Sequence, residues 1–142
     1  MEHSAGERLA LIGESFARLT GQQLCSGDLW TAPVAVVAHG TQGVPRFFYA
    51  NRAGLSLFRM SAAQFIDLPS HESAEPDLRE ERARIFTRLE AQNVVQGYSG
   101  VRIAADGTRF TIKDAVIWNL LDEHGQRHGQ AAAIGQWEAV AG

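Results

Sequence analysis

The last third of the chain, residues 97–138, constrains the fold more than any other segment. It reads GYSGVRIAADGTRFTIKDAVIWNLLDEHGQRHGQAAAIGQWE. Three strand-like runs in it are separated by two turn signals, Asp106-Gly107 and Asp122-Glu123-His124-Gly125. Asp-Gly pairs and short glycine-containing loops between such runs are typical of antiparallel hairpins. The segment therefore predicts three consecutive strands of an antiparallel meander.

Asp114 stands out within the second of these strands. The apolar residues around it share one parity, which predicts a single buried face made of Phe110, Ile112, Val116 and Trp118. Asp114 has the same parity, and desolvation would raise the pKa of an inward carboxyl. The other interpretation is a β-bulge that turns Asp114 outward. Parity alone leaves both interpretations open.

The third strand of the meander, Gln130–Trp137, is rich in alanine and contains Gly135. Small side chains suit close packing against helices. They also leave space that either the helices or a bound group must occupy. The strand therefore marks one wall of a possible ligand cavity.

Two further strands and several short helices precede the meander. Val34–His39 and Arg46–Ala50 flank a turn and predict a hairpin. Asn51 follows directly and is suited to cap a short helix that ends near Phe58, because its side chain can accept a backbone N–H of the first turn. This part of the chain therefore alternates between strand and helix over short distances.

The next two helices have their own start signals. Ser61-Ala62-Ala63-Gln64 matches the capping box, and Pro69 predicts where that helix ends. A third helix is predicted from near Pro76, because proline suits the first helical turn. Its inward face is expected to consist of Leu78, Ile85, Phe86 and Leu89.

An amphipathic helix is predicted near the N-terminus, within residues 1–28, ahead of a main domain at residues 29–142. Its apolar stripe consists of Leu9, Ile12, Phe16 and Leu19, at spacings typical of one helix face. The stripe can be buried on the open face of the sheet or against a second subunit. We therefore expect the helix to cap the sheet or to form the contact of a homodimer.

Composition limits the class of protein. The 142 residues are 45% hydrophobic and 20% charged, which is typical of a single globular domain. The net charge is −3, and the arginines of residues 79–90 are interleaved with glutamates, so direct nucleic-acid binding is not expected. Cys25 is the only cysteine, and no apolar run is long enough for a membrane span. We expect a cytoplasmic protein.

The order of the predicted elements resembles the PAS fold, and several motifs are similar to the MEKHLA domain family, a PAS-like group. The motifs that carry this resemblance are YANRAGLSLF, LPSHESAEP, REERARIF, GYSGVRI and WNLLDEHGQRHGQAA. The resemblance implies an α/β fold with a five-stranded antiparallel sheet, helices on one face and the amphipathic helix on the other. It also implies a sensory or regulatory role, and the chain resembles the members that occur as stand-alone proteins in bacteria.

Plant members carry this domain at the C-terminus of homeodomain-leucine zipper transcription factors. No homeodomain or zipper is recognisable here, and the hexapeptide MEKHLA is absent. We therefore do not expect the partners of the plant proteins for this chain, and the resemblance implies no catalytic residues.

The cofactor remains unknown from the sequence. Flavin photochemistry of the LOV type needs a cysteine within a motif similar to NCRFLQ, and Cys25 lies far from any such position. Haem would need an axial donor, and His71 precedes the third helix instead of lying on it. His124 and His128 flank a turn and do not form a zinc motif.

The aromatic and apolar residues predict either a filled core or a ligand cavity. In the cavity interpretation, a small apolar or metabolite ligand contacts Val36, Tyr49, Leu55, Phe58, Phe65, Phe86, Val101, Ile112, Asp114 and Trp118. The chain would then be a non-enzymatic sensory module that binds a small ligand or a protein partner.

Two alternatives remain open. One is a pure dimerisation or interaction module without a ligand. The other is a small enzyme of the ketosteroid-isomerase-like type that uses Asp114 and His39 as acid and base. Two predicted strands before the internal helices count against this enzyme, since that fold generally places its long helices first.

Overall fold

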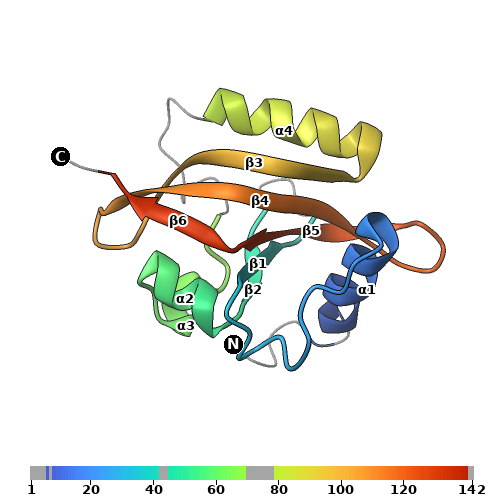
Figure 1. Cartoon of the computed structure of the whole chain (residues 1–142), viewed down its shortest axis with the longest axis horizontal. Coiled ribbons are helices and arrows are strands. Elements are labelled where there is room, and N and C mark those ends of the chain that lie inside the picture. The colour runs from blue at the N-terminus through green and yellow to red at the C-terminus, as the bar shows by residue number, and fades with distance from the viewer. Residues whose placement is uncertain (1–5, 7, 42–44, 70–78, 141–142) are drawn as a thin grey trace.

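The structure is a computed structural model, and it describes residues 6, 8–41, 45–69 and 79–140. Within the described residues the chain forms one antiparallel sheet with helices on both faces (Figure 1). The elements are α1 (Arg8–Thr20), β1 (Ala35–His39), β2 (Phe47–Ala50), α2 (Arg52–Phe58), α3 (Ala62–Phe65), α4 (Arg79–Gln92), β3 (Val94–Ile103), β4 (Arg109–Leu121), β5 (Arg127–Ile134) and β6 (Gln136–Ala139).

The sheet has the strand order β2-β1-β5-β4-β3, and β6 pairs with the first part of β4. The predicted hairpin and the predicted meander are both present. The predicted strand Gln130–Trp137 is divided at Gly135, because β5 pairs with residues 116–121 of β4 and β6 with residues 110–113. The expected fifth strand is therefore two strands, placed one after the other along β4.

A β-bulge in β4 changes the face of the sheet to which the side chains of this strand point. Tyr98 is paired with Ala115 and Gly100 with Ile112, so two residues of β4 lie opposite one residue of β3. Asp114 adopts a left-handed backbone with φ of 51° and is exposed. The bulge interpretation is therefore confirmed, and the inward orientation of Asp114 is wrong.

The bulge also corrects the expected single apolar face of β4. An extra residue in a strand moves every later side chain to the opposite face. Phe110 and Ile112 consequently share a face with Ala115 and Ile117, whereas Trp118 points the other way with Val116 and Leu120.

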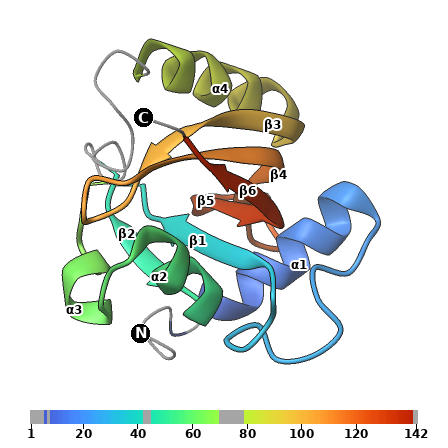
Figure 2. The ribbon, with the colours of Figure 1, turned by 60° about the vertical axis from the view of Figure 1, so that its left-hand side comes forward.

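Two hydrophobic clusters lie on opposite faces of the sheet. The larger cluster joins the sheet to α2, α3 and α4 through Leu57, Phe58, Phe65, Ile85 and Leu89. The smaller cluster joins it to α1 (Figure 2). The expected arrangement, with internal helices on one face and the N-terminal helix on the other, is confirmed.

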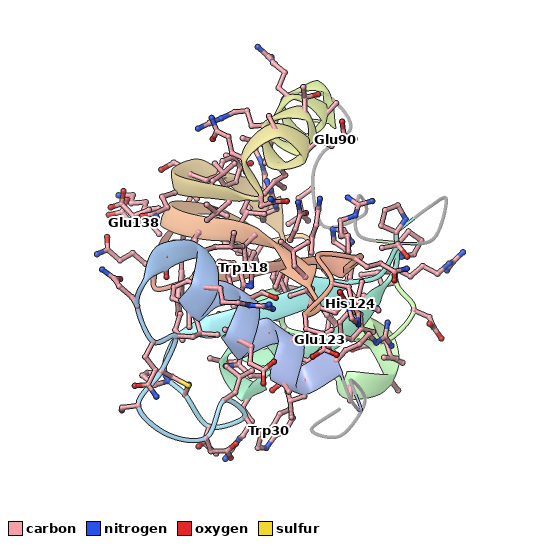
Figure 3. The ribbon with its side chains drawn as sticks, turned by 90° about the vertical axis from the view of Figure 1, so that its right-hand side faces the viewer. Trp30, Glu90, Trp118, Glu123, His124 and Glu138 are labelled. Atoms are coloured by element: carbon pink, nitrogen blue, oxygen red, sulfur yellow. The ribbon has the colours of Figure 1, made fainter. Side chains whose placement is uncertain are left out.

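α1 is fixed to β4 by both packing and hydrogen bonds. Ile12 is fully buried, and the ring of Phe16 meets that of Trp118 edge to face with centroids 4.9 Å apart. Trp118 lies beside α1 (Figure 3), and its Nε1 donates to the carbonyl of Ile12 at 3.1 Å. Ser15 Oγ accepts from the backbone N–H of Leu121 at 2.8 Å. The space beside Trp118 is therefore filled by α1.

The predicted helix starts are largely present. Asn51 Oδ1 accepts from the backbone N–H of Gly54 at 2.9 Å, and Ser61 with Gln64 forms the capping box. α3 ends at Phe65 rather than near Pro69. The start of α4 near Pro76 lies outside the described residues. The described residues contain no helix that is both long and apolar enough to cross a membrane.

Candidate functional site

A cavity of about 70 Å³ lies between the sheet and the helices of the larger hydrophobic cluster. The sheet supplies most of its wall, and α2 and α4 each supply one apolar side chain. The lining residues are Val37, His39, Phe47, Phe58, Ile85, Tyr98, Arg102, Ile112, Ile117, Gln130, Ala131, Ala132 and Ile134. Two of the three alanines of β5, Ala131 and Ala132, therefore border this space, as their small size predicts.

Aromatic packing fills most of the region around this cavity. The rings of Phe47 and Phe65 are stacked with centroids 4.3 Å apart, and Phe58 meets Phe110 edge to face at 5.4 Å. These contacts hold α2 and α3 against β2 and β4. The aromatic residues consequently serve mainly to fill the core, and the cavity is the space between them that stays unfilled.

A row of three polar residues crosses the sheet at one end of the cavity. His39 on β1 is paired with Gln130 on β5, and Gln130 is paired with Asn119 on β4. Directly paired residues of antiparallel strands point to the same face. All three side chains therefore lie on the face covered by α2, α3 and α4, within an otherwise apolar layer.

Two acceptors in this row lack partners. Gln130 and Asn119 are each 3% exposed, and Gln130 Oε1 and Asn119 Oδ1 have no hydrogen-bond partner among the described residues. More than nine in ten buried polar groups in proteins do have a partner. An unpartnered buried acceptor is costly, which makes these two amides unusual among the buried polar groups of the sheet.

Asn119 is held in place through its other amide atom. Its Nδ2 donates to the carbonyl of Leu89 and to Oδ1 of Asn93, both at 3.0 Å. The backbone N–H of Asn119 donates to the carbonyl of Asn93 at 2.9 Å. Asn119 thus connects the sheet at this end of the cavity to the last turn of α4.

Arg102 and Tyr98 form a separate polar pair in the cavity wall, on β3. Arg102 Nη2 donates to Tyr98 Oη at 3.0 Å, and Nη1 donates to the carbonyl of Val101 at 2.9 Å. Two of the donor atoms of the guanidinium are therefore already engaged. His39 Nδ1 lies 3.0 Å from the carbonyl oxygen of Gly40.

The structure places two of the predicted ligand contacts, Phe58 and Ile112, in the cavity wall. Leu55 and Phe65 pack in the same cluster without lining the cavity, and Val101 is half-buried on β3. The side chain of Phe86 lies outside the described residues. The remaining predicted contacts lie elsewhere: Val36, Tyr49 and Trp118 in the cluster under α1, and Asp114 on the exposed bulge.

The predicted acid and base do not share a site. His39 lines the cavity, whereas Asp114 is exposed at the bulge of β4. Asn119 and Gln130 were not among the predicted site residues. The signal that indicates them is a single polar residue inside an apolar strand, as in IWNLL and GQAAAI.

The cavity does not fit a flavin with LOV-type chemistry. Its volume of about 70 Å³ is far below the roughly 300–1,000 Å³ of pockets for larger ligands. Cys25 is half-buried in the segment after α1 and is not among the lining residues. The described residues contain no group of three potential metal-ligating side chains.

Comparison with known proteins identifies the domain type. The MEKHLA domain family matches residues 7–139, a range that includes α1. The homeobox-leucine zipper protein ATHB-9 of Arabidopsis thaliana is 22% identical over 125 residues, which cover 83% of this chain. The homeobox-leucine zipper protein HOX32 of Oryza sativa is 22% identical over 139 residues, or 91% of the chain. The chain spans only 15% and 16% of the lengths of these two relatives.

Solved structures of PAS and LOV domains share the fold. A PAS domain from Colwellia psychrerythraea has a TM-score of 0.65 and 20% identity, covering 75% of this chain and 87% of that one. The light-state dimer of the fungal blue-light photoreceptor Vivid has a TM-score of 0.64 and 17% identity, with 92% of each chain covered. The fold is thus PAS-like, and the chain belongs to the MEKHLA domain family.

Proposed function

We propose that this chain is a non-enzymatic sensory or regulatory module in which a small ligand changes the packing between the sheet and its helices. The family and the PAS-like fold support the module class. The observation that carries the proposal is the cavity between the sheet, α2 and α4, whose wall is mostly apolar and includes the buried side chain of Gln130. A protein partner that acts on the same helices is the other form of the proposal.

In this proposal, α4 is the helix that responds to a ligand in the cavity. This helix is attached to the sheet by the buried side chains of Ile85 and Leu89 and by the hydrogen bonds of Asn119. Ile85 also lines the cavity. A ligand that contacts Ile85 and Gln130 would therefore favour one position of α4, because a ligand shifts an equilibrium toward the state it binds more tightly.

Native mass spectrometry and hydrogen exchange test this function together. We expect the purified protein to retain a small molecule, or to take one up, and the amides of α4 to exchange more slowly in the bound form. Absorbance spectra of the same sample identify a chromophore. Two results together would contradict ligand sensing: the protein retains no small molecule, and no cavity-sized compound alters the exchange of the α4 amides. The chain would then be a pure interaction module.

The proposal includes a homodimer. Vivid, which has the same fold, forms a dimer in its light state. In the present chain, Ile12 and Phe16 of the predicted contact are buried within the monomer, whereas Leu9 and Leu19 are half-buried. The dimer contact we propose therefore uses the ends of the α1 stripe.

A further inference from the structure

We infer that α4 is a lid over the cavity, that it opens as a unit about Asn93, and that Asn119 is the latch that holds it closed. This role rests on the proposed ligand-sensing function and adds a regulated entrance to the same cavity. Three observations carry it: the one-residue connection between α4 and β3, the hydrogen bonds of Asn119, and the small buried surface of α4.

The connection between α4 and β3 provides the hinge. Asn93 alone separates α4, which ends at Gln92, from β3, which begins at Val94. α4 lies along β3 and turns into it at this residue (Figure 1). Asn93 adopts a left-handed backbone with φ of 64°, and its N–H donates to the carbonyl of Leu89 at 2.8 Å. Left-handed asparagines commonly end helices in this way. The change of direction is therefore confined to one residue.

Asn119 on β4 binds the end of α4 beside this hinge. Its Nδ2 donates to the carbonyl of Leu89 and to Oδ1 of Asn93, both at 3.0 Å. A backbone carbonyl can only accept, so the contact with Leu89 shows that the donor end of the amide faces α4. The side chain of Asn119 is 3% exposed, and hydrogen bonds shielded from water are stronger than exposed ones. These two bonds therefore hold the last turn of α4 on the sheet.

The latch leaves one of its own atoms unsatisfied. Asn119 Oδ1 is buried and has no hydrogen-bond partner among the described residues. A buried acceptor without a partner is costly, and water reaches it once α4 lifts from the sheet. The closed position of α4 therefore carries a cost that the open position lacks. This cost lowers the free energy needed to open the lid.

The apolar attachment of α4 is small. Among the α4 side chains whose burial the structure describes, Ile85 and Leu89 are buried and the others are exposed. Among these same side chains, Ile85 lines the cavity. Segments with few buried apolar contacts open at a lower free energy than the core of a fold. When α4 opens, the cavity loses part of its wall, and a small molecule can enter there.

Native-state hydrogen exchange of the full chain, without a ligand, tests the latch. We expect the amides of residues 85–92 to share one opening free energy, smaller than that of β4 and β5. Asn93→Gly keeps the left-handed backbone and removes the side-chain acceptor. It should raise the exchange rate of the α4 amides about fivefold, the factor typical of one lost hydrogen bond, and leave β4 and β5 unchanged.

Two further variants complete this test. Asn119→Leu keeps a side chain of similar size, and it should raise the exchange rate of the α4 amides further because both Nδ2 bonds are lost. Asp67→Gly is the control, since Asp67 is exposed after α3 and is also left-handed, with φ of 65°. It should leave the exchange of the α4 amides unchanged.

Two results would reject the latch. One is exchange of the α4 amides that neither variant alters. The other is an equal acceleration of the α4, β4 and β5 amides, which would mean that Asn119 supports the whole fold and that α4 does not open separately. If Asn119→Leu folds poorly, Asn93→Gly decides between these outcomes.

Xenon tests whether α4 is the entrance, because xenon enters dry apolar cavities. In xenon NMR, Asn93→Gly should exchange xenon with the cavity faster by the same factor as its α4 amides. Xenon exchange that is unchanged in this variant, or absent, would overturn the role of α4 as the entrance. Ligand sensing is decided separately, by a retained molecule and by α4 exchange with added compounds. A lid that opens in a protein that no compound affects would therefore reject the proposed function alone.

Discussion

Single residues decide where the side chains of this sheet point. Asp114 adopts a left-handed backbone in the middle of β4, with φ of 51°. Aspartate tolerates this conformation better than most residues, and glycine adopts it freely. The bulge that results lets one strand contribute Ile112 and Ile117 to the cavity and Trp118 to the contact with α1.

The conformation of Asp114 makes a prediction about stability. Asp114→Gly should leave the free energy of unfolding unchanged or raise it by up to about 1 kcal/mol, whereas Asp114→Val should lower it by about 1–2 kcal/mol. Urea unfolding measures both. Thr111→Val, in a regular part of the same strand, is the control for β-propensity. If Asp114→Val were as stable as the native chain, the bulge would not exist in this form.

At the level of elements, turns and helix ends are stabilised by local hydrogen bonds. Asp122 organises the β4–β5 turn: its Oδ1 accepts from the backbone N–H groups of His124 and Gln126, both at 2.9 Å. Its Oδ2 lies 2.8 Å from Nε2 of His128. α1 lies beside this turn (Figure 1), and Arg18 donates to the carbonyl of Leu121. The turn therefore joins the meander to the N-terminal helix.

The β4–β5 turn is expected to be sensitive to acid. The hydrogen bond to His128, followed by that from the Gln126 amide, lowers the pKa of Asp122 from 3.8 to about 2. Because the folded-state pKa is depressed, the carboxylate stabilises the turn fully above pH 3.8. This contribution is lost as the pH falls toward about 2.

NMR or hydrogen exchange of the turn amides between about pH 5 and pH 2 measures this effect, and Asp122→Asn is the control. The variant should show a flatter pH response of the turn amides and faster exchange at the upper end of this range. Identical pH responses in the variant and the native chain would contradict the assignment.

At the scale of the whole molecule, the two faces of the sheet have different roles. One face is closed by α1, which is fixed through Ile12, Ser15 and Trp118. The other face holds the cavity and α4, whose Ile85 reaches the cavity wall. We therefore expect a ligand in the cavity to change the packing of α4 while α1 keeps the opposite face intact.

The proposed homodimer is tested at the ends of the α1 stripe. Leu9→Glu with Leu19→Glu should convert a dimer to a monomer, because both half-buried side chains lie at the ends of the α1 stripe. Analytical ultracentrifugation with circular dichroism measures mass and folding together. Ala10→Glu, at an exposed position next to the stripe, is the control. A stable dimer in the double variant would reject this contact.

Several features of the fold are predictable because they depend on neighbours in the chain. The caps at Asn51 and Ser61 need only residues within one helical turn. The hairpins need only turn residues between strand-forming runs. The element order and the MEKHLA resemblance follow from such local signals, and both are confirmed.

The candidate site is less predictable, because its features depend on residues far apart in the chain. The bulge at Asp114 is defined by pairing with β3, and a shift of one residue moves Ile112 and Trp118 to opposite faces. Trp118 therefore lies on the α1 side of the sheet and not at this cavity. Val36 of β1 and Tyr49 of β2 lie on the same side.

The sequence by itself determined the kinds of elements, their order and the amphipathic stripe of α1, because periodicity and capping act within a few residues. Only the tertiary structure decided that Gln130 lies between His39 and Asn119 and that its acceptor lacks a donor among the described residues. Whether a buried group is satisfied depends on every side chain that packs around it. That information appears only when strands and helices from the whole chain come together.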